Sequence, residues 1–159
     1  MKSLQEKVVI ITGGSSGIGR ATALSLAGIG ARVLITGRRA VSLDETAKDQ
    51  PNIETLVADT AEPQDASRTV ARAIERWGRL DVLINNAGAG AIMPLADVSA
   101  KRIIDIFAVN VLGPSLLAKE SLPYLRRRKA RSSIYPAPMA PKQVRHSHTT
   151  ARAKPHSNI

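Results

Sequence analysis

The chain has 159 residues, a length typical of one domain, and 43% of them are hydrophobic, which is enough for a packed core. The formal net charge is +10, but no acidic residue follows Glu120 and nine basic residues lie between Arg126 and Lys154, so the body is close to neutral. The absence of cysteine excludes disulfides and cysteine-bound metal, and no apolar run is long enough for a membrane span or a signal-peptide core. We therefore expect a soluble cytoplasmic protein that binds no metal.

The first 125 residues alternate short apolar runs, typical of buried parallel strands, with stretches whose apolar residues recur at helical spacing. Gly78 is placed to end a long helix that has Pro63 in its first turn, and Ser99 is placed to cap the next helix. This alternation predicts an α/β fold, a Rossmann-like, doubly wound parallel sheet with helices on both faces. The expected strands are 8–11, 32–36, 53–58 and 80–84, and the expected helices are 17–27, 41–49, 62–77, 100–107 and 115–128.

Residues 12–19 read Thr-Gly-Gly-Ser-Ser-Gly-Ile-Gly and lie between the first expected strand and the first expected helix. A glycine-rich turn at this place can hold the pyrophosphate of a dinucleotide, because the backbone approaches the phosphates closely and the free N–H groups of the helix start face the anion. A tight strand–helix turn without a ligand is the alternative interpretation. The dinucleotide interpretation assigns the turn and its phosphate contacts to Gly13, Ser15, Ser16, Gly17, Ile18 and Gly19.

Two further motifs follow in order, Asn-Asn-Ala-Gly at 85–88 after the fourth strand and Asn110 within Val-Asn-Val-Leu-Gly. Together with the glycine-rich turn they resemble the short-chain dehydrogenase/reductase family over residues 7 to about 125. The resemblance implies hydride transfer between a nicotinamide dinucleotide and a small carbonyl or alcohol substrate. It also implies that Asn86, Ala87 and Gly88 pack beside the adenosine ribose and that Asn110 supports a water relay. A polar residue that caps a helix kink is the alternative interpretation of Asn110.

The choice of cofactor is expected to depend on the end of the second strand. An acidic side chain there would accept hydrogen bonds from the ribose 2′-hydroxyl of NAD, whereas this chain has Arg38 and Arg39. A guanidinium matches a 2′-phosphate in charge and bidentate geometry, so we expect NADP(H) over NAD(H), with Arg38 as the contact. Two solvated arginines at a helix start are the alternative. Asp59 resembles the aspartate of the family that touches the adenine, and a turn residue at a strand end is its alternative.

The resemblance also implies catalytic groups that have no counterpart in this sequence. They are a Tyr-x-x-x-Lys pair, in which the lysine lowers the pKa of the tyrosine, and an upstream serine. Tyr124 is followed four positions later by Arg128, and Tyr135 by Met139. An apolar fifth strand that ends in Ser-Ser is likewise missing. We therefore expect a sheet that is incomplete at its C-terminal side, cofactor binding at most, and impaired catalysis.

The sequence divides into a dinucleotide-binding domain at 1–125 and a basic, proline- and histidine-rich tail at 126–159, which we expect to be irregular. Read one nucleotide out of frame, the codons of the tail permit Ala-Ile-Val-Asn-Ile-Ser-Ser-Thr-Tyr-Gly and then Tyr-Ser-Ala-Ser-Lys-Ala. These segments resemble the missing strand and the missing Tyr-x-x-x-Lys pair. Our hypothesis is a frameshift near residues 125–129. Sequencing of the gene tests it, because a shifted frame without those motifs would remove the hypothesis.

The basic tail and the missing fifth strand bear on possible partners and on stability. Basic tail residues could contact nucleic-acid phosphates, but the tail lacks interleaved aromatic residues and any recognised binding motif, so we do not expect a nucleic-acid partner. The family forms oligomers through C-terminal helices, and we do not expect stable oligomers where the support of those helices is incomplete. Without a neighbouring strand at 80–84, we expect low stability and a tendency to aggregate.

Overall fold

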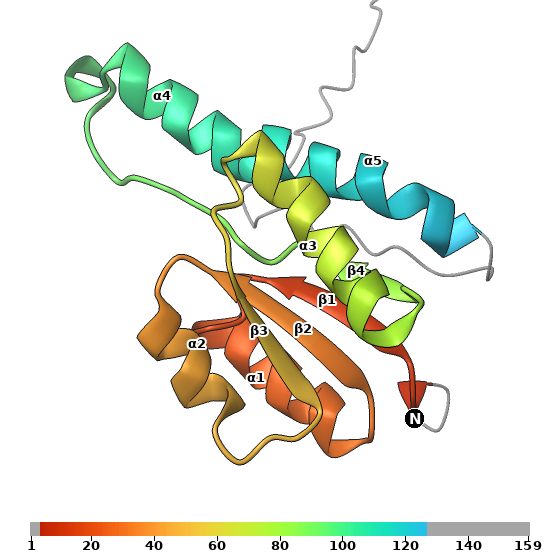
Figure 1. Ribbon diagram of the computed structural model, residues 1–159. Helices are drawn as coiled ribbons and strands as arrows, with labels where there is room; N and C mark the ends of the chain where they lie inside the picture. Colours follow the sequence, from red (N-terminus) through yellow and green to blue (C-terminus); the bar gives the residue numbers. More distant parts are fainter. Residues whose placement is uncertain (1–3, 127–159) are drawn as a thin grey trace, which may run out of the picture.

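The computed structural model describes residues 4–126, and Figure 1 shows a sheet with helices on both of its faces. The strands are β1 (Val8–Thr12), β2 (Arg32–Gly37), β3 (Ile53–Val57) and β4 (Val82–Ile84). The α-helices are α1 (Gly17–Gly28), α2 (Ala40–Ala47), α3 (Pro63–Trp77), α4 (Ala100–Phe107) and α5 (Gly113–Arg126). A short 3-10 helix, η2 (Leu95–Asp97), precedes α4, and a π-helical segment, η3 (Ala108–Leu112), joins α4 to α5.

The four strands lie in the order β3-β2-β1-β4 and all run parallel. Val8 of β1 lies beside Arg32 of β2, and Val9 lies beside Val82 of β4. The carboxyl ends of the four strands therefore meet at one end of the sheet, where open α/β sheets bind their ligands. The predicted Rossmann-like α/β fold is confirmed. Within the described residues the sheet ends at β4, so its C-terminal side is incomplete.

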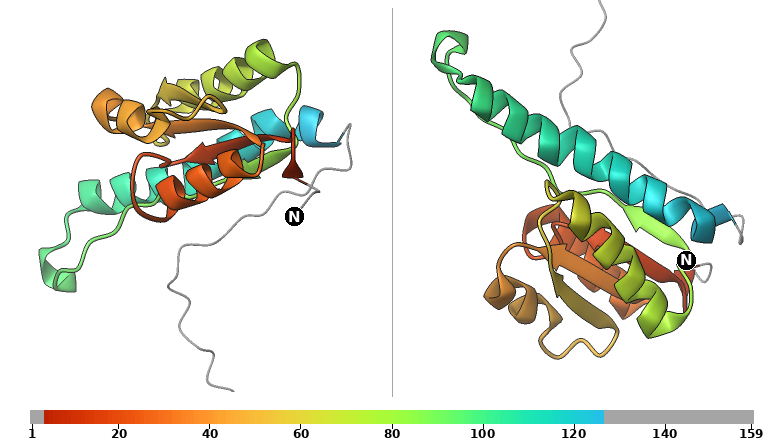
Figure 2. Two further views of the ribbon diagram at one scale, coloured as in Figure 1. Left: turned by 90° about the horizontal axis from the view of Figure 1, so that it is seen from below. Right: turned by 45° about the horizontal axis from the view of Figure 1, so that its top comes forward.

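The core has two halves, one on each face of the sheet. Every residue of β1 is buried, as expected for a central parallel strand that is covered on both faces. Val9 and Ile11 belong to a cluster with residues of α1 and α2, whereas Val8 and Ile10 belong to a cluster with residues of α3 and α5. The alternation of side chains along β1 thus assigns the helices to opposite faces (Figure 2).

Local helix signals behave as predicted at several boundaries. Gly78 ends α3 in the left-handed conformation with a φ of 68°, and Pro63 occupies the first turn of the same helix. Oγ of Ser99 accepts a hydrogen bond from the backbone N–H of Arg102 at 3.2 Å, which caps the start of α4. These signals are short-range, so the sequence alone is enough to place them.

The prediction of two separate helices on either side of Gly113 was wrong. Figure 1 shows α4, η3 and α5 as one continuous helical rod. Pro114 falls in the first turn of α5, where its missing N–H is tolerated, and the preceding turn has the wider π geometry. A Cβ at Gly113 would overlap the carbonyl oxygen of Thr60, so this glycine allows the helix to approach the loop after β3. At the position where the sequence predicts a helix break, the helix continues and lies in close contact with the loop after β3.

Other boundaries differ by one or two residues from the predicted ones. β4 starts at Val82 instead of residue 80, β3 ends at Val57, and α2 ends at Ala47. Apart from Arg126, the predicted tail at 126–159 lies outside the described residues. The frameshift hypothesis concerns the same residues and stays a prediction. None of the helices between residues 4 and 126 has the length and apolar character needed to cross a membrane. The same residues hold no group of three or more histidine or acidic side chains that could bind a metal ion.

The amino ends of β1 and β4 are fastened by the buried carboxylate of Asp81. Its Oδ2 accepts a hydrogen bond from the backbone N–H of Val8 at 3.0 Å and another from Nε of Arg79 at 2.7 Å. Nζ of Lys7 lies 3.5 Å from Oδ1. Burial alone would raise the pKa of the Asp81 carboxyl, but the hydrogen bonds from Arg79 and Val8 and the charges of Arg79 and Lys7 together lower that pKa below its ordinary value of 3.8.

Replacement of Asp81 by Asn should lower the free energy of unfolding by about 2–3 kcal/mol near neutral pH, because the charge-assisted hydrogen bonds are lost. Since the pKa of Asp81 is lower in the folded than in the unfolded chain, its contribution is present above the ordinary aspartate pKa and disappears as pH falls through the lowered value. Urea unfolding between about pH 3 and 7 measures both effects. Equal stability of the two proteins at neutral pH would contradict this role.

Candidate cofactor site

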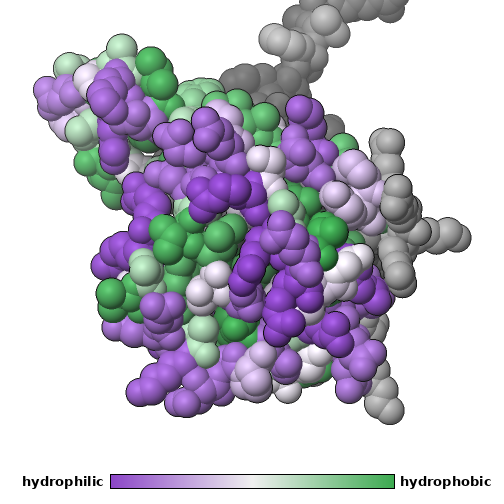
Figure 3. Space-filling view, viewed as in Figure 1, coloured by the Kyte–Doolittle hydropathy of each residue, from purple (hydrophilic) through white to green (hydrophobic). Residues whose placement is uncertain are grey.

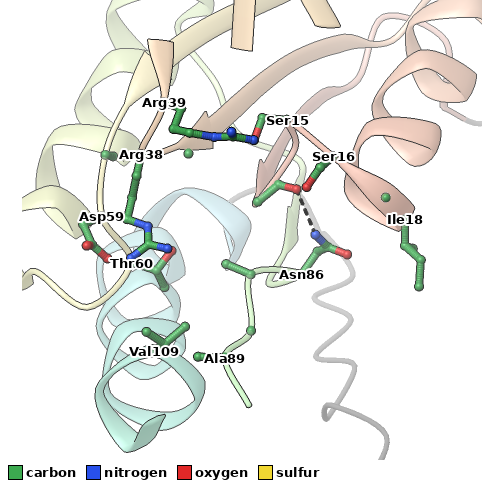
Figure 4. Close-up of a pocket in the computed structure, with 16 residues that line it drawn as sticks. Ser15, Ser16, Ile18, Arg38, Arg39, Asp59, Thr60, Asn86, Ala89 and Val109 are labelled. Carbon is green, nitrogen blue, oxygen red and sulfur yellow. Dashed lines mark hydrogen bonds between the residues drawn. The ribbon is translucent and has the colours of Figure 1, made fainter. Parts of the chain in front are cut away.

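A cavity of about 600 Å³ lies at the carboxyl ends of the strands, between the glycine-rich turn, the loop after β3 and the segment after β4. Figure 4 shows its walls. Ten of the eleven residues predicted to bind the cofactor line it, which brings together segments that are up to 75 positions apart in the sequence. These ten are Gly13, Ser15, Ser16, Gly17, Ile18, Arg38, Asp59, Asn86, Ala87 and Gly88.

The glycine-rich turn is tied to the segment after β4 by a set of hydrogen bonds. Oγ1 of the buried Thr12 accepts the backbone N–H groups of Asn86 and Ala87, both at 3.0 Å. In return, Nδ2 of Asn86 donates to the carbonyl oxygen of Thr12 at 2.9 Å and to that of Gly13 at 3.2 Å, and the second bond is the dashed line in Figure 4. The side chain of Asn86 is therefore engaged in shaping the turn. Thr12, which sequence analysis did not assign to the site, is the acceptor that organises it.

The start of α1 faces the cavity with free backbone donors. Ser16 is the N-cap residue, but its side chain makes no capping hydrogen bond to the first turn. Gly13 and Gly17 have positive φ values of 66° and 51°, a conformation that glycine adopts without strain. The N–H groups of the first helical turn are thus available to an anion, and the helix dipole favours one there.

Gly19 is the one predicted cofactor residue that does not line the cavity. It lies behind the turn, where a Cβ would overlap the carbonyl oxygen of Gly13 and Nδ2 of Asn86. Its role is to let α1 pack against the turn. The sequence motif predicted that Gly19 shapes the turn, and the close approach of α1 to the turn is the reason for a glycine here.

Two arginines reach the cavity from the end of β2. In Figure 4, Arg38 extends towards Asp59 and Thr60, whereas Arg39 extends across the cavity towards Ser15. The sequence predicted Arg38 alone as the cofactor contact. The two side chains place guanidinium charge on two sides of the same space, so Arg39 joins the candidate residues.

Asp59 lines the cavity and also builds a turn. Its Oδ1 accepts the backbone N–H of Ala61 at 3.0 Å, and its own N–H donates to Oδ2 of Asp65 at 2.7 Å. This is the turn role that sequence analysis gave as the alternative. The turn engages one carboxylate oxygen, so the adenine contact stays a prediction.

Asn110 lies in η3 and does not line the cavity. Its Oδ1 accepts the backbone N–H of Ala89 at 3.0 Å, and its Nδ2 donates to the carbonyl oxygen of Ala89 at 2.6 Å. Both polar ends of the carboxamide are therefore used to hold the segment after β4 against the helical rod. The position at an irregular helix turn agrees with the alternative interpretation, and the water-relay role stays a prediction.

Six lining residues were not among the predicted cofactor contacts. They come from the ends of β2 and β3, from the segment after β4 and from η3, and the position of each depends on the packing of distant elements. The one sequence signal that could have found some of these residues is their position at the end of a predicted strand. They are Gly37, Arg39, Ala58, Thr60, Ala89 and Val109.

The described lining holds no tyrosine or lysine that could exchange a proton with a substrate. Tyr124 packs partly buried against the core cluster beneath α3 and α5, and Tyr135 lies outside the described residues. The arrangement can therefore bind an anionic, ribose-containing ligand, while the described residues supply no general acid of the expected type.

Gly19→Ala should destabilise the protein by about 1–3 kcal/mol and weaken dinucleotide binding, because a methyl group there displaces the turn. Gly28→Ala is the matched control on the same helix, since a Cβ there meets open space and the change should be neutral or stabilising by up to about 1 kcal/mol. Thermal melting of both variants checks this. Equal effects of the two substitutions would contradict the close contact at Gly19.

Known proteins match this chain over most of its described length. A family model described as short chain dehydrogenase matches residues 7–134. The 11-beta-hydroxysteroid dehydrogenase 1A of Arabidopsis thaliana is 38% identical over 135 residues, which cover 79% of this chain and 38% of that protein. The chain spans about half or less of the length of such curated relatives.

Solved structures agree in fold. A short-chain dehydrogenase from Streptomyces avermitilis superposes with a TM-score of 0.76 at 33% identity, covering 82% of this chain and 48% of that one. A short chain dehydrogenase from Bacillus anthracis gives a TM-score of 0.76 at 34% identity, covering 82% of this chain and 56% of its own. With a family model matched over most of its length and the same fold at this identity, the chain belongs to the short-chain dehydrogenase family.

Proposed function

We propose that this chain binds NADP(H) in the cavity at the carboxyl ends of β1 to β4 and descends from oxidoreductases that act on a small carbonyl or alcohol. The observation that carries the proposal is that the uncapped N-terminus of α1, after the glycine-rich turn, and two arginines from the end of β2 line the same cavity. The proposal includes the domain boundary near residue 125 and the cytoplasmic location, both expected from the sequence. Oligomers and nucleic-acid partners form no part of it.

The residues of the cavity fit a dinucleotide in shape and charge. Gly13 has a positive φ, and a Cβ there would stand 3.1 Å from the Cα of Ala87, so the glycine keeps the floor of the turn open. The N–H groups at the start of α1 would hold the pyrophosphate, and the segment of Ala87 and Gly88 would face a ribose. The bound nicotinamide would supply or accept the hydride.

The preference for NADP(H) rests on charge. The cavity carries the guanidinium groups of Arg38 and Arg39 at the end of β2, where NAD-binding proteins have an acidic residue for the ribose 2′-hydroxyl. A 2′-phosphate brings a dianion to this place, and a guanidinium can hold it with two parallel hydrogen bonds. Asp59 is the only acidic residue of the lining, and one of its oxygens already accepts the Ala61 N–H.

Catalysis by this chain is impaired under the same proposal. Reduction of a carbonyl needs a proton for the oxygen as well as a hydride for the carbon, and the described lining provides no tyrosine–lysine pair to deliver it. The carboxamide of Asn110 makes hydrogen bonds to both main-chain groups of Ala89. Asn110 therefore holds the segment beside the cavity and is not free to bind a substrate.

The Arg38→Ala variant should bind NADPH about 10- to 100-fold more weakly, while its affinity for NADH stays within about twofold, because only NADPH carries the 2′-phosphate. Arg32→Ala is the matched control, since Arg32 is exposed at the opposite end of the same strand. Isothermal titration calorimetry of the full chain with both cofactors measures the affinities. Equal losses for NADPH and NADH would contradict the preference.

A second experiment addresses turnover. The full chain should bind NADPH yet oxidise it in the presence of small aldehydes and ketones no faster than a control without protein, as followed by the absorbance of the nicotinamide. Robust substrate-dependent oxidation of NADPH would overturn the part of the proposal that concerns impaired catalysis.

A further inference from the structure

The first turn of α3 is hydrogen-bonded back to the loop and the strand that precede it. Asp65 lies in this turn, and its side chain is 15% exposed. Its Oδ2 accepts the backbone N–H of Asp59 at 2.7 Å, and its Oδ1 accepts Nη1 of Arg68 at 2.6 Å. Nη2 of Arg68 donates to the carbonyl oxygen of Val57, the last residue of β3, at 2.8 Å. The Asp65–Arg68 pair thus connects α3 to both the end of β3 and the loop that follows it.

The hydrogen bond between Asp65 and Asp59 differs from the ordinary capping of a helix. An acidic side chain at the third helical position commonly accepts the N–H of the N-cap residue. In α3 the N-cap residue is Glu62, whose N–H already donates to the carbonyl oxygen of Asp59 at 3.0 Å. Asp65 instead accepts the N–H of Asp59, which precedes the N-cap. Because Asp59 lines the cavity, the Asp65 carboxylate places a residue of the cavity wall.

Asp59 itself is held by three hydrogen bonds. Its Oδ1 accepts the N–H of Ala61 at 3.0 Å, and its carbonyl oxygen accepts the N–H of Glu62. Both of these partners follow closely in the chain, so the two bonds form a local turn that can move as a unit. The third bond joins the N–H of Asp59 to Asp65 within α3 and fixes the turn relative to that helix. Loss of the third bond would therefore let the turn and the Asp59 carboxylate move together.

The Asp59 carboxylate shares the cavity wall with a guanidinium of opposite charge. Both Asp59 and Arg38 line the cavity, and Figure 4 shows Arg38 extending towards Asp59. Arg38 nevertheless forms no ion pair with a carboxylate between residues 4 and 126. A small movement of the turn towards Arg38 would allow such a pair to form. The carboxylate would then compete with an anionic ligand for the guanidinium.

We propose that the Asp65–Arg68 pair positions Asp59 and thereby sets the cofactor preference, because it keeps the Asp59 carboxylate away from Arg38. Arg38 then stays available for the 2′-phosphate of NADP(H). This inference rests on the proposed function, since it concerns the same site. Neither Asp65 nor Arg68 lines the cavity, so both act through Asp59 and are positioning residues.

A second contact between α3 and β3 provides a matched control. Glu54 of β3 pairs with Arg72, and its Oε2 lies 3.5 Å from Nε of Arg76. Like Asp65, Glu54 is an acidic side chain held by arginine of α3, and it does not line the cavity. Figure 3 shows a mostly hydrophilic surface over this helix. Glu54→Ala therefore removes the same charge and the same kind of contact without a link to Asp59.

The test compares the NADPH and NADH affinities of the full chain by isothermal titration calorimetry. In Asp65→Ala the ratio of NADPH to NADH affinity should fall about three- to fivefold, the effect of competition from one solvent-exposed ion pair. Glu54→Ala should leave the ratio unchanged. Charge alone would raise the ratio in Asp65→Ala, because an acidic group that repels the 2′-phosphate is lost. The direction of the change therefore separates positioning from simple charge.

Two double variants show whether the effect passes through Asp59 and Arg38. Asp59→Asn added to Asp65→Ala should restore the ratio to within about twofold of the unmodified chain, because a carboxamide cannot form an ion pair with a guanidinium. In an Arg38→Ala background, Asp65→Ala should change the ratio no further, as expected when one residue acts through the other. A merely structural role of Asp65 would lower both affinities alike and would show no restoration.

Equal losses of NADPH and NADH affinity in Asp65→Ala, or a ratio that Asp59→Asn does not restore, would overturn the inference. Arg68→Gln is the milder change, because it leaves the bond between Asp65 and Asp59 in place, and it should lower the ratio in the same direction. An unchanged ratio in Arg68→Gln would overturn the inference even where Asp65→Ala does not fold. Failure of the proposed function is seen separately, because the unmodified chain would then bind NADPH no more tightly than NADH.

Discussion

The hydroxyl of Thr12 is the point on which the candidate site depends. Buried at the carboxyl end of β1, it accepts two N–H groups from the segment after β4, while Asn86 returns two hydrogen bonds to the turn after β1. At the other end of the same pair of strands, Asp81 holds the N–H of Val8. β1 and β4 are thus held together by hydrogen bonds at both ends, and those at the carboxyl end set the shape of the glycine-rich turn. A ligand that binds the turn therefore meets a surface that is already formed.

Cofactor binding and proton transfer make different demands on this site. Parallel strands bring the turn, the arginines after β2 and the loop after β3 to one end of the sheet, which gives a site with positive charge, free N–H groups and little bulk. These are the properties of a dinucleotide cradle. Transfer of a proton requires side chains that the described lining does not include, which is why we propose cofactor binding without turnover.

The sequence was most informative where the determinants are local. Apolar runs marked the four strands, Gly78 and Ser99 marked helix ends, and the glycine motif marked the turn. It was least informative where a contact between distant elements decides the outcome. Gly113 suggested a helix break, but its lack of a side chain allows α5 to approach Thr60 closely. Arg39 was missed because only the folded backbone shows that it reaches the same space as Arg38.

Mapping of the NADPH contact on the full chain tests the central claim most directly. Amide chemical shifts recorded by nuclear magnetic resonance during an NADPH titration should change at 13–19, 37–39 and 86–89 and saturate together. The account would be contradicted if the shifts that saturate lay elsewhere on the sheet. It would also be contradicted if millimolar NADPH changed no amide shift.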